Sequence, residues 1–584
     1  MKWDLSPQYY SGPNDKKIED DLNRLESEVT KFADKYARLS KKQELSETMV
    51  FESIKNYEST QVLYYTLYVY IHLQFWEDMA NAEVKSLYER VTKRLAKITP
   101  KLAFYELELA ALPSEIIDIK LPAMTAAADY LRYLKDVRRK ASFRLSEREE
   151  EIISIMRSSG IEAIKRAYVE LTSAFKYQLC IDDEKRFVRR AELNKYLHGS
   201  DTQLRRDAYD ELVRVHFEHK VLLVNFLSAA VEANLSESKL RGYSYPEEPK
   251  LVVEGVSKDV FDAVMGTVEN NKKYFGEYLK LKKKHFGLDF ARFADRYASP
   301  GETSNIAIED AIEMIKSAFE SFHPEFAEAA NLFFSENRIH SDISEGKFGG
   351  ALCGSSSPGR GGYILCNYNG TFADILTLAH ETGHCLHHYF ARNQTILNYH
   401  FPHTLAEIGS IFSELLVCEH LIANNNEDST KNGFLMALLD KFLLNAGDEA
   451  LYTRFQSTIY RRKESEALNA DFLSKTWQKE VESMFGKEAI QTDLDRYGWI
   501  TIGGLVRRPP FSSFPYTFSV LIALLLYRQL KQASSEEKGK FLKMLSNGAK
   551  YSANDALAEF GLDIHNPNTW QKGFDQAWEL LGKL

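Results

Sequence analysis

Cysteine is scarce in this chain of 584 residues. No two of the cysteines form a C-x-x-C pair, and their number is odd, which argues against a disulfide framework and against a structural zinc knuckle. We therefore expect reduced, mostly buried thiols. The five cysteines are Cys180, Cys353, Cys366, Cys385 and Cys418.

Proline and glycine are also below their average usage, with 15 and 30 residues. Long amphipathic, charged stretches recur instead, which indicates a helix-rich protein. Because the chain exceeds the usual size of one domain, two or more subdomains are expected. Turn residues at 197–200 predict a boundary near residue 200, between an N-terminal helical domain (1–200) and a second domain (201–584).

The chain has no strong excess of one charge and no long apolar run. The net charge of −9 comes from mixed signs throughout, which argues against a nucleic-acid partner. The longest apolar run, 518–527, is too short to span a bilayer, and residues 1–10 lack the apolar core of a signal peptide. We expect a cytoplasmic protein without a membrane span.

Apolar residues recur every three or four positions near the N-terminus, as is typical of a long helix that packs on a neighbour. Similar periodic segments continue to about residue 340. This part of the chain is therefore predicted to be helical. The N-terminal seam consists of Leu22, Leu25, Val29, Phe32, Tyr36 and Leu39.

The only glycine-dense part of the chain lies at 346–370. Helix cannot persist there, and residues 363–368 are predicted to form a short strand. The glycine spacing matches neither a phosphate-binding loop nor a dinucleotide-binding fingerprint. Two interpretations remain, a turn-rich loop without a ligand and a strand that another backbone approaches closely.

A capped helix with a metal-binding motif follows this strand. Thr371 and Asp374 have the spacing of a capping box, and the sequence His-Glu-Thr-Gly-His occupies 380–384. Residues four apart project from one helix face, so His380 and His384 can bind a single ion. Glu381 lies beside them, where it can accept a proton from metal-bound water. The alternative is a pair of histidines without a metal.

Catalytic zinc needs three protein ligands, so a third must come from elsewhere in the chain. A second helix is predicted near residue 404, and its Glu407 follows His384 by 23 residues, enough for a turn and an antiparallel return. Glu407 also lies three residues after Thr404, which gives it a competing role in a capping box. Glu414 is the alternative third ligand, or a partner that hydrogen-bonds a ligand.

Four further histidines lie near the motif in sequence. His387 is on the same predicted helix face as His384 and is expected to pack or hydrogen-bond rather than bind metal. His388, His400 and His403 are expected at solvated or loop positions, with His400 and His403 as candidates for lining the site.

Three segments carry a family resemblance: 367–384 (NYNGTFADILTLAHETGH), 401–414 (FPHTLAEIGSIFSE) and 514–518 (FPYTF). They resemble the thimet oligopeptidase and oligoendopeptidase F family of zinc metallopeptidases, particularly its oligoendopeptidase F branch. The resemblance implies a mainly α fold of two helical halves around a deep substrate cleft, with a small β element before the zinc-binding helix. It implies one Zn²⁺ per chain, bound by His380, His384 and Glu407, and makes 201–584 the catalytic domain.

The implied function is that of a zinc-dependent endopeptidase that hydrolyses internal bonds of short oligopeptides. Glu381 would activate a zinc-bound water as general base. The predicted strand at 363–368 could pair with an extended substrate. The alternative is a zinc-binding, catalytically attenuated protein of the same fold that binds peptides or a partner.

The C-terminal region departs from the family pattern. Relatives usually present a histidine and a tyrosine that hydrogen-bond the transition state, whereas this chain lacks the histidine and has Val520 where many relatives have tyrosine. Tyr516 is the predicted remaining catalytic donor, with a packed aromatic side chain as the alternative. Arg507 and Arg508 are candidates for an electrostatic substitute. The missing histidine and tyrosine favour the attenuated alternative, whereas the intact Glu381 argues against it.

Overall fold

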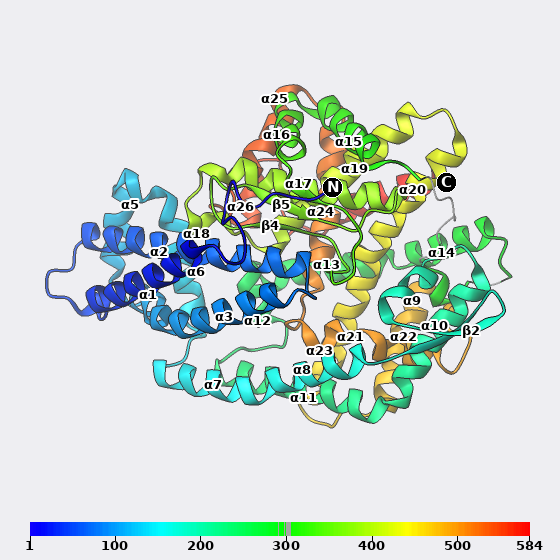
Figure 1. The fold of residues 1–584 in the computed structure, drawn as a ribbon, viewed down its shortest axis with the longest axis horizontal. Coiled ribbons are helices and arrows are strands. Elements are labelled where there is room, and N and C mark those ends of the chain that lie inside the picture. Colours follow the sequence, from blue (N-terminus) through cyan, green and yellow to red (C-terminus); the bar gives the residue numbers. More distant parts are fainter. Residues whose placement is uncertain (290, 297, 299–304) are drawn as a thin grey trace. The chain divides into compact units, whose positions relative to one another are not determined.

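The computed structural model describes residues 1–289, 291–296, 298 and 305–584 (Figure 1). It is mainly helical, as predicted, and it contains two small β-sheets, of which one was predicted. The chain packs into two compact units, each drawn from three stretches of sequence. Unit 1 comprises Met1–Arg144, Ser304–Asn424 and Leu526–Asp563, and unit 2 comprises Leu145–Thr303, Asn425–Leu525 and Ile564–Leu584. The single boundary near residue 200 is not tested by this division and stays a prediction.

Unit 1 holds most of the N-terminal helices and the histidine motif. Its helices are α1 (Lys16–Tyr36), α2 (Glu47–Glu77), α3 (Ala82–Ile98), α4 (Ala103–Ala110), α5 (Leu121–Ala123), α6 (Leu131–Ala141), α15 (Ile308–Phe322), α16 (Pro324–Ser335), α17 (Phe372–Phe390), α18 (Ile396–Tyr399), α19 (His403–Asn424), α25 (Ser535–Ser546) and α26 (Ala553–Ala558). Its strands are β3 (Ile339–His340), β4 (Leu352–Ser355) and β5 (Gly362–Leu365).

Unit 2 contains the remaining helices and a β-hairpin. Its helices are α7 (Glu147–Ser159), α8 (Ile161–Ser173), α9 (Arg190–Leu197), α10 (Thr202–Glu218), α11 (Lys220–Leu240), α12 (Glu248–Glu254), α13 (Lys258–Asn271), α14 (Lys273–His285), α20 (Asp428–Phe442), α21 (Glu449–Lys463), α22 (Ala470–Phe485), α23 (Gly504–Arg507) and α27 (Pro567–Leu581). Its strands are β1 (Tyr177–Ile181) and β2 (Glu184–Val188). Helix α24 (Phe514–Leu530) runs from unit 2 into unit 1.

Short 3₁₀ and π segments connect several of these helices. The 3₁₀ segments are η1 (Leu39–Lys41), η2 (Thr99–Leu102), η4 (Thr125–Tyr130), η5 (Phe293–Asp295), η6 (Ala391–Asn393), η8 (Lys487–Ala489) and η9 (Asp495–Thr501), and the π segments are η3 (Glu115–Lys120) and η7 (Leu443–Asp448). Among the residues described, no helix is long and apolar enough to cross a membrane.

The predicted N-terminal seam is confirmed. Its first five members lie on α1 and are buried, and Leu39 is buried in η1. The side chain of Asp15 begins α1 by accepting a hydrogen bond from the Lys17 N–H. Helix α1 packs against α2 and α3, so the seam faces the core of unit 1.

A three-stranded sheet in the order β3–β5–β4 lies beside α17. Strands β4 and β5 are labelled next to α17 in Figure 1. β3 is parallel to β5, and β4 is antiparallel to it. Strand β5 confirms the predicted strand but is shorter and occupies the centre of the sheet. The prediction that a substrate pairs with this strand is therefore wrong, because both edges of β5 already have hydrogen-bonded neighbouring strands. The two edges of the sheet belong to β3 and β4.

Gly362 shows why this region needs glycine. A Cβ atom there would lie 2.7 Å from Cys385 Sγ on α17 and 2.8 Å from Cys353 Sγ on β4. The close approach predicted for the glycine-rich strand is therefore present. The two sulfur atoms are 3.0 Å apart, and all five cysteines are free thiols, three of them buried.

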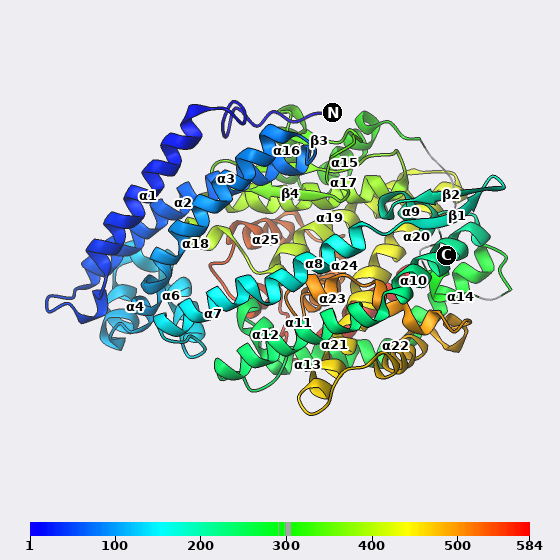
Figure 2. The same ribbon diagram turned by 60° about the horizontal axis from the view of Figure 1, so that its bottom comes forward.

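The β1–β2 hairpin was not predicted, because that part of the chain was expected to be helical. Its two strands are antiparallel and lie beside α10 (Figure 2). The connecting residues Asp182 and Asp183 both have positive φ, 52° and 62°. Positive φ at both central residues is the conformation of a type I′ turn, which glycine usually marks in sequences.

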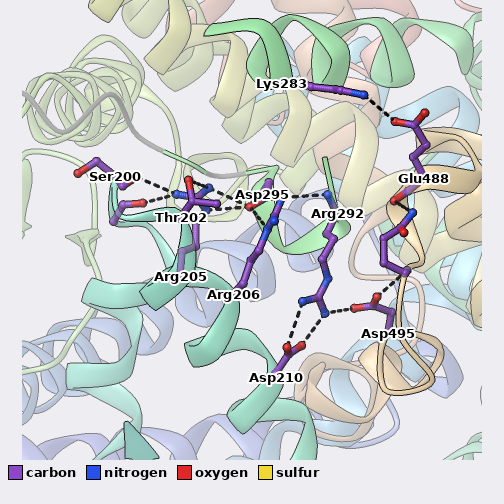
Figure 3. A network of polar contacts seen from close by, with 12 residues as sticks. Ser200, Thr202, Arg205, Arg206, Asp210, Lys283, Arg292, Asp295, Glu488 and Asp495 are labelled. Carbon is purple, nitrogen blue, oxygen red and sulfur yellow. Dashed lines mark hydrogen bonds and ion pairs between the residues drawn. The ribbon is translucent and has the colours of Figure 1, made fainter. Parts of the chain in front are cut away.

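Buried charges in unit 2 join η5 to α10 and η9 (Figure 3). Asp295 is fully buried and accepts hydrogen bonds from Arg205 Nη2 at 2.9 Å, Arg206 Nη2 at 2.7 Å and the Arg292 backbone N–H at 2.9 Å. The Arg292 guanidinium donates to Asp210 at 2.5 Å. Breaking such buried pairs is costly, so the network fixes these segments to one another.

The same guanidinium connects the network to η9. Arg292 Nη2 lies 2.7 Å from Asp495 Oδ1, and the Asp495 side chain also accepts from the backbone N–H groups of Gln491 and Thr492. Three arginines therefore face three aspartates, and the network is balanced in charge.

Candidate metal and catalytic site

The predicted capping box begins α17. Thr371 Oγ1 accepts from the Asp374 N–H at 3.1 Å, and the Asp374 carboxylate accepts from the Thr371 N–H at 3.1 Å. Both bonds satisfy backbone donors that the first helical turn would otherwise leave unpaired. The helix then places His380 and His384 on one face, with their ring centroids 4.9 Å apart.

Helix α19 runs antiparallel to α17. As residue numbers rise from His380 through Gly383 on α17, their contacts on α19 fall from Glu414 to Ser410. A Cβ on Gly383 would lie 2.6 Å from Ser410 Cα and 2.7 Å from Gly409 O. The glycine is therefore required for the two helices to approach so closely, and this approach brings Glu407 to the histidines.

Gly383→Ala is expected to destabilise unit 1 by about 1–3 kcal/mol, because the added methyl group meets backbone atoms that cannot move independently. It should also weaken metal binding by shifting α19 away from α17. Thermal unfolding and metal content measure the two effects. Gly539→Ala on α25 is the matched control, since nothing lies within 4 Å of its Cβ position. Equal melting temperatures for the two variants would contradict the close-packing argument.

The side chains of His380, His384 and Glu407 form a cluster. Glu407 Oε2 lies 3.3 Å from His380 Nε2 and 3.5 Å from His384 Nε2, and one ligand atom from each residue lies within 4.8 Å of the others. Ser410 Oγ donates to Glu407 Oε2 at 3.1 Å. The capping-box alternative for Glu407 is wrong, because α19 begins at His403 and Thr404 already lies inside the helix.

Glu414 hydrogen-bonds the opposite side of His380. Its Oε1 atom lies 2.7 Å from His380 Nδ1, and its side chain is buried. A proton on Nδ1 would leave the lone pair of Nε2 directed toward the cluster. Of the two roles considered for Glu414, this geometry matches the hydrogen-bonding partner rather than the ligand.

The electrostatics of the cluster favour a cation. Burial lowers the pKa of His380, but Glu414 and Glu407 outweigh it and raise that pKa to about 10. Burial raises the pKa of Glu407, but His384 and His380 bring it well below its usual range. Two imidazoles and one carboxylate from facing helices are also the donor set of a catalytic zinc site. The residues present therefore fit a zinc ion.

Glu381 is buried beside the cluster, one position after His380 on α17. Adjacent residues of a helix project in different directions, so the Glu381 side chain does not point the same way as the two histidines. The motif thus separates the groups suited to bind metal from a neighbouring carboxylate suited to move a proton.

The neighbouring histidines pack against aromatic rings. His387 stacks on Phe401 with ring centroids 3.7 Å apart, and burial, aided by His384, lowers its pKa to about 3. This confirms a packing role. His388 also stacks on Phe401, so its predicted solvated position is wrong. His400 is half-buried against Tyr65.

His403 is exposed at the first position of α19, as expected for a solvated residue. Sequence reasoning missed Ser410 as a donor to Glu407, although the two lie three residues apart on α19, a spacing at which helical side chains are neighbours.

The C-terminal candidates belong to unit 2, whereas the histidine cluster belongs to unit 1. Tyr516 is half-buried in the first turn of α24, and its role as a donor stays a prediction. Arg507 ends α23, and both it and Arg508 are exposed. Val520 is 2% exposed within α24.

Val520→Tyr is expected to destabilise unit 2 by about 1–3 kcal/mol, because the packed core has no room for a phenol. Thermal unfolding measures the effect, with Val221→Tyr at a 67% exposed position as the control. An unchanged melting temperature together with a raised kcat would contradict it.

Comparison with known proteins decides the family. The sequence profile described as "Peptidase family M3" matches residues 195–576. The chain belongs to peptidase family M3. An M3 N-terminal profile, "Oligopeptidase F", matches residues 108–177. M3 is a metallopeptidase family, and the cluster of His380, His384 and Glu407 is a possible metal site within the matched region.

The curated M3 relatives are distant but collinear. An oligoendopeptidase F homolog of Lactococcus lactis subsp. lactis is 22% identical over 100% of this chain and 96% of its own length. The group B oligopeptidase PepB of Streptococcus agalactiae is 22% identical over 89% of this chain and 86% of its own length.

Solved structures share the M3 fold of this chain. The oligoendopeptidase F of Enterococcus faecium has a TM-score of 0.71 at 18% identity and covers 97% of this chain and 99% of its own. A protein of Chlamydophila abortus has a TM-score of 0.83 at 20% identity and covers 100% and 97%. The mainly helical fold is confirmed.

Proposed function

We propose that the protein is a cytoplasmic, zinc-dependent endopeptidase that hydrolyses internal bonds of short oligopeptides. The observation that carries this proposal is the cluster of His380, His384 and Glu407 on two antiparallel helices, with Glu381 beside it. One Zn²⁺ per chain would be bound by the three cluster residues. Membership of family M3 supports peptidase activity in general.

Each of these residues would have a separate role in the reaction. Zn²⁺, when bound, supplies a Lewis acid that polarises the scissile carbonyl and activates water. Glu381 accepts a proton from the attacking water and returns it to the leaving amine. Glu414 orients His380 through their hydrogen bond, and Tyr516 is the proposed donor to the developing negative charge.

Substrate binding is proposed at the edge of the small sheet. β4 is an edge strand, and its residues 352–354 are partly exposed. An extended peptide can add to such an edge through backbone hydrogen bonds, while a folded domain offers no extended segment. This explains a preference for short, unfolded substrates.

A quenched fluorescent peptide tests the proposal. Turnover is expected to stop with a chelator and to return when zinc is added, and an intact, stably folded small domain should resist cleavage. Binding of the peptide without turnover, in protein that contains one zinc, would favour the attenuated alternative. Rapid digestion of the folded domain would contradict the restriction to short peptides.

A further inference from the structure

Unit 2 contains a cavity of about 200 Å³ that the proposed reaction does not use. Segments α9, α10, η5, η9 and α22 contribute to its wall. Its polar lining consists mainly of Arg190, His198, Tyr209, Arg296 and Trp477, with Gly498 on one side. The rest of the wall is largely apolar.

Two buried hydrogen-bond donors in this wall have no partner. Tyr209 Oη and Trp477 Nε1 are both buried without a hydrogen bond to any described group, and their side chains are 6% and 1% exposed. The indole N–H can only donate, and burial raises the pKa of Tyr209, so its hydroxyl keeps its proton. Both groups therefore need an acceptor.

The two donors converge on the backbone of Gly498. The position of a Cβ on this residue would be 2.7 Å from Tyr209 Oη and 2.9 Å from Trp477 Nε1. A side chain at position 498 would therefore clash with both donors, and glycine is the residue that lets them lie together in the wall of the cavity. A buried donor left unsatisfied costs stability, so the arrangement favours an occupant that accepts hydrogen bonds.

The charges that line the cavity favour an anion. Arg190 is exposed and hydrogen-bonds Asn194 at 2.5 Å, and no acidic partner for it occurs in the described part of the chain. Arg296 pairs with Asp448 at 3.0 Å. Burial lowers the pKa of His198 to about 4, and Arg296, Lys282 and Arg190 add to this effect, which indicates a positive field.

The buried ion network holds the cavity in shape (Figure 3). It ties together α10, η5 and η9, which supply Tyr209, Phe293 and Gly498 to the wall. A site whose donors are fixed before the ligand arrives loses less conformational freedom on binding. The cavity is therefore preorganised.

The lining also limits the rest of the ligand. Leu197, Leu212, Phe293 and Ile502 offer an apolar surface, and the described residues that line the cavity include no aspartate or glutamate. A ligand with a free ammonium group would leave that charge without a partner. The volume is below that of sites for drug-sized molecules, which are roughly 300–1,000 Å³. The ligand is accordingly small, apolar and anionic.

We propose that this cavity binds the carboxylate of an N-acylated apolar amino acid, which is also the chemistry of the C-terminal residue of a peptide. The carboxylate accepts hydrogen bonds from Tyr209 and Trp477 and faces the positive field of Arg190. The acyl nitrogen carries no charge, which matches the described lining residues, none of which is acidic. This site is separate from the histidine cluster and does not depend on turnover.

Calorimetric titration of the full chain with N-acetylphenylalanine tests the proposal. Saturable binding is expected, with at least tenfold weaker binding of both N-acetylphenylalaninamide and free phenylalanine. A pentapeptide that ends in phenylalanine is titrated into the Glu381→Gln variant, both with a free C-terminal carboxylate and as the C-terminal amide. This titration distinguishes peptide C-termini from free N-acyl amino acids as the source of the carboxylate. Tighter binding of the peptide acid assigns the site to peptide C-termini, and tighter binding of the small acid assigns it to free N-acyl amino acids.

Two substitutions localise the binding. Tyr209→Phe removes one donor and should weaken binding at least fivefold without changing the melting temperature, while Tyr245→Phe, outside the cavity, should have no effect. Arg190→Gln should weaken binding of the acid but leave that of the amide unchanged. Absence of saturable binding, equal binding of acid and amide, or an unchanged Kd in Tyr209→Phe would overturn the proposal.

Discussion

Glu381→Gln is expected to lower kcat on a short peptide by about 10²–10⁴ while the protein keeps one zinc per chain. The glutamine side chain has nearly the same shape but cannot accept a proton from the attacking water. Glu381 lies on the same helix as His380 and His384, yet it is not part of the cluster that would hold the ion. Peptide turnover and metal content, measured on the same preparation, separate the two roles.

The control is Glu328→Gln, an exposed change on α16 that should alter neither quantity. Loss of zinc from Glu381→Gln would show that Glu381 helps to bind the metal. Turnover at the wild-type rate would show that another group moves the proton, and the assignment of Glu381 as general base would fail.

The sequence was most informative where the signals were local. The capping box of Thr371 and Asp374, the apolar seam and the histidine spacing all act within about one or two helical turns. Helix α17 could therefore be predicted with its start and the face that carries both histidines. The N-terminal seam of α1 was predictable for the same reason.

Features that depend on contacts between distant parts of the chain could not be predicted from the sequence. Whether Glu407 caps a helix or faces the histidines depends on where α19 begins, which its packing on α17 decides. Burial of His388 depends on Phe401, in a separate element. The order β3–β5–β4, which places the predicted strand at the centre of the sheet, is likewise a tertiary property.

Weak local signals account for a second kind of error. The β1–β2 turn uses Asp182 and Asp183 at positive φ, without the glycine that normally marks such a turn. The donors in the unit 2 cavity have no local signal in the sequence at all. Tyr209 and Trp477 are ordinary aromatic residues in sequence, and only the fold reveals that both donors lie beside Gly498.

Glu407→Ala is expected to empty the metal site, whereas Glu414→Ala should retain zinc with an affinity lowered by about 10–100-fold. The difference follows from geometry: Glu407 Oε2 lies within 3.5 Å of both Nε2 atoms, whereas Glu414 contacts only the Nδ1 side of His380. Zinc content after dialysis against a graded series of chelator concentrations measures the ranking. Glu414→Gln refines the test, because its amide oxygen can still accept a hydrogen bond from His380 Nδ1. This variant should therefore retain much of the zinc affinity that Glu414→Ala loses. If Glu414→Ala lost zinc more readily than Glu407→Ala, Glu414 would be the third ligand and the hydrogen bond to His380 would be a feature of the metal-free arrangement alone.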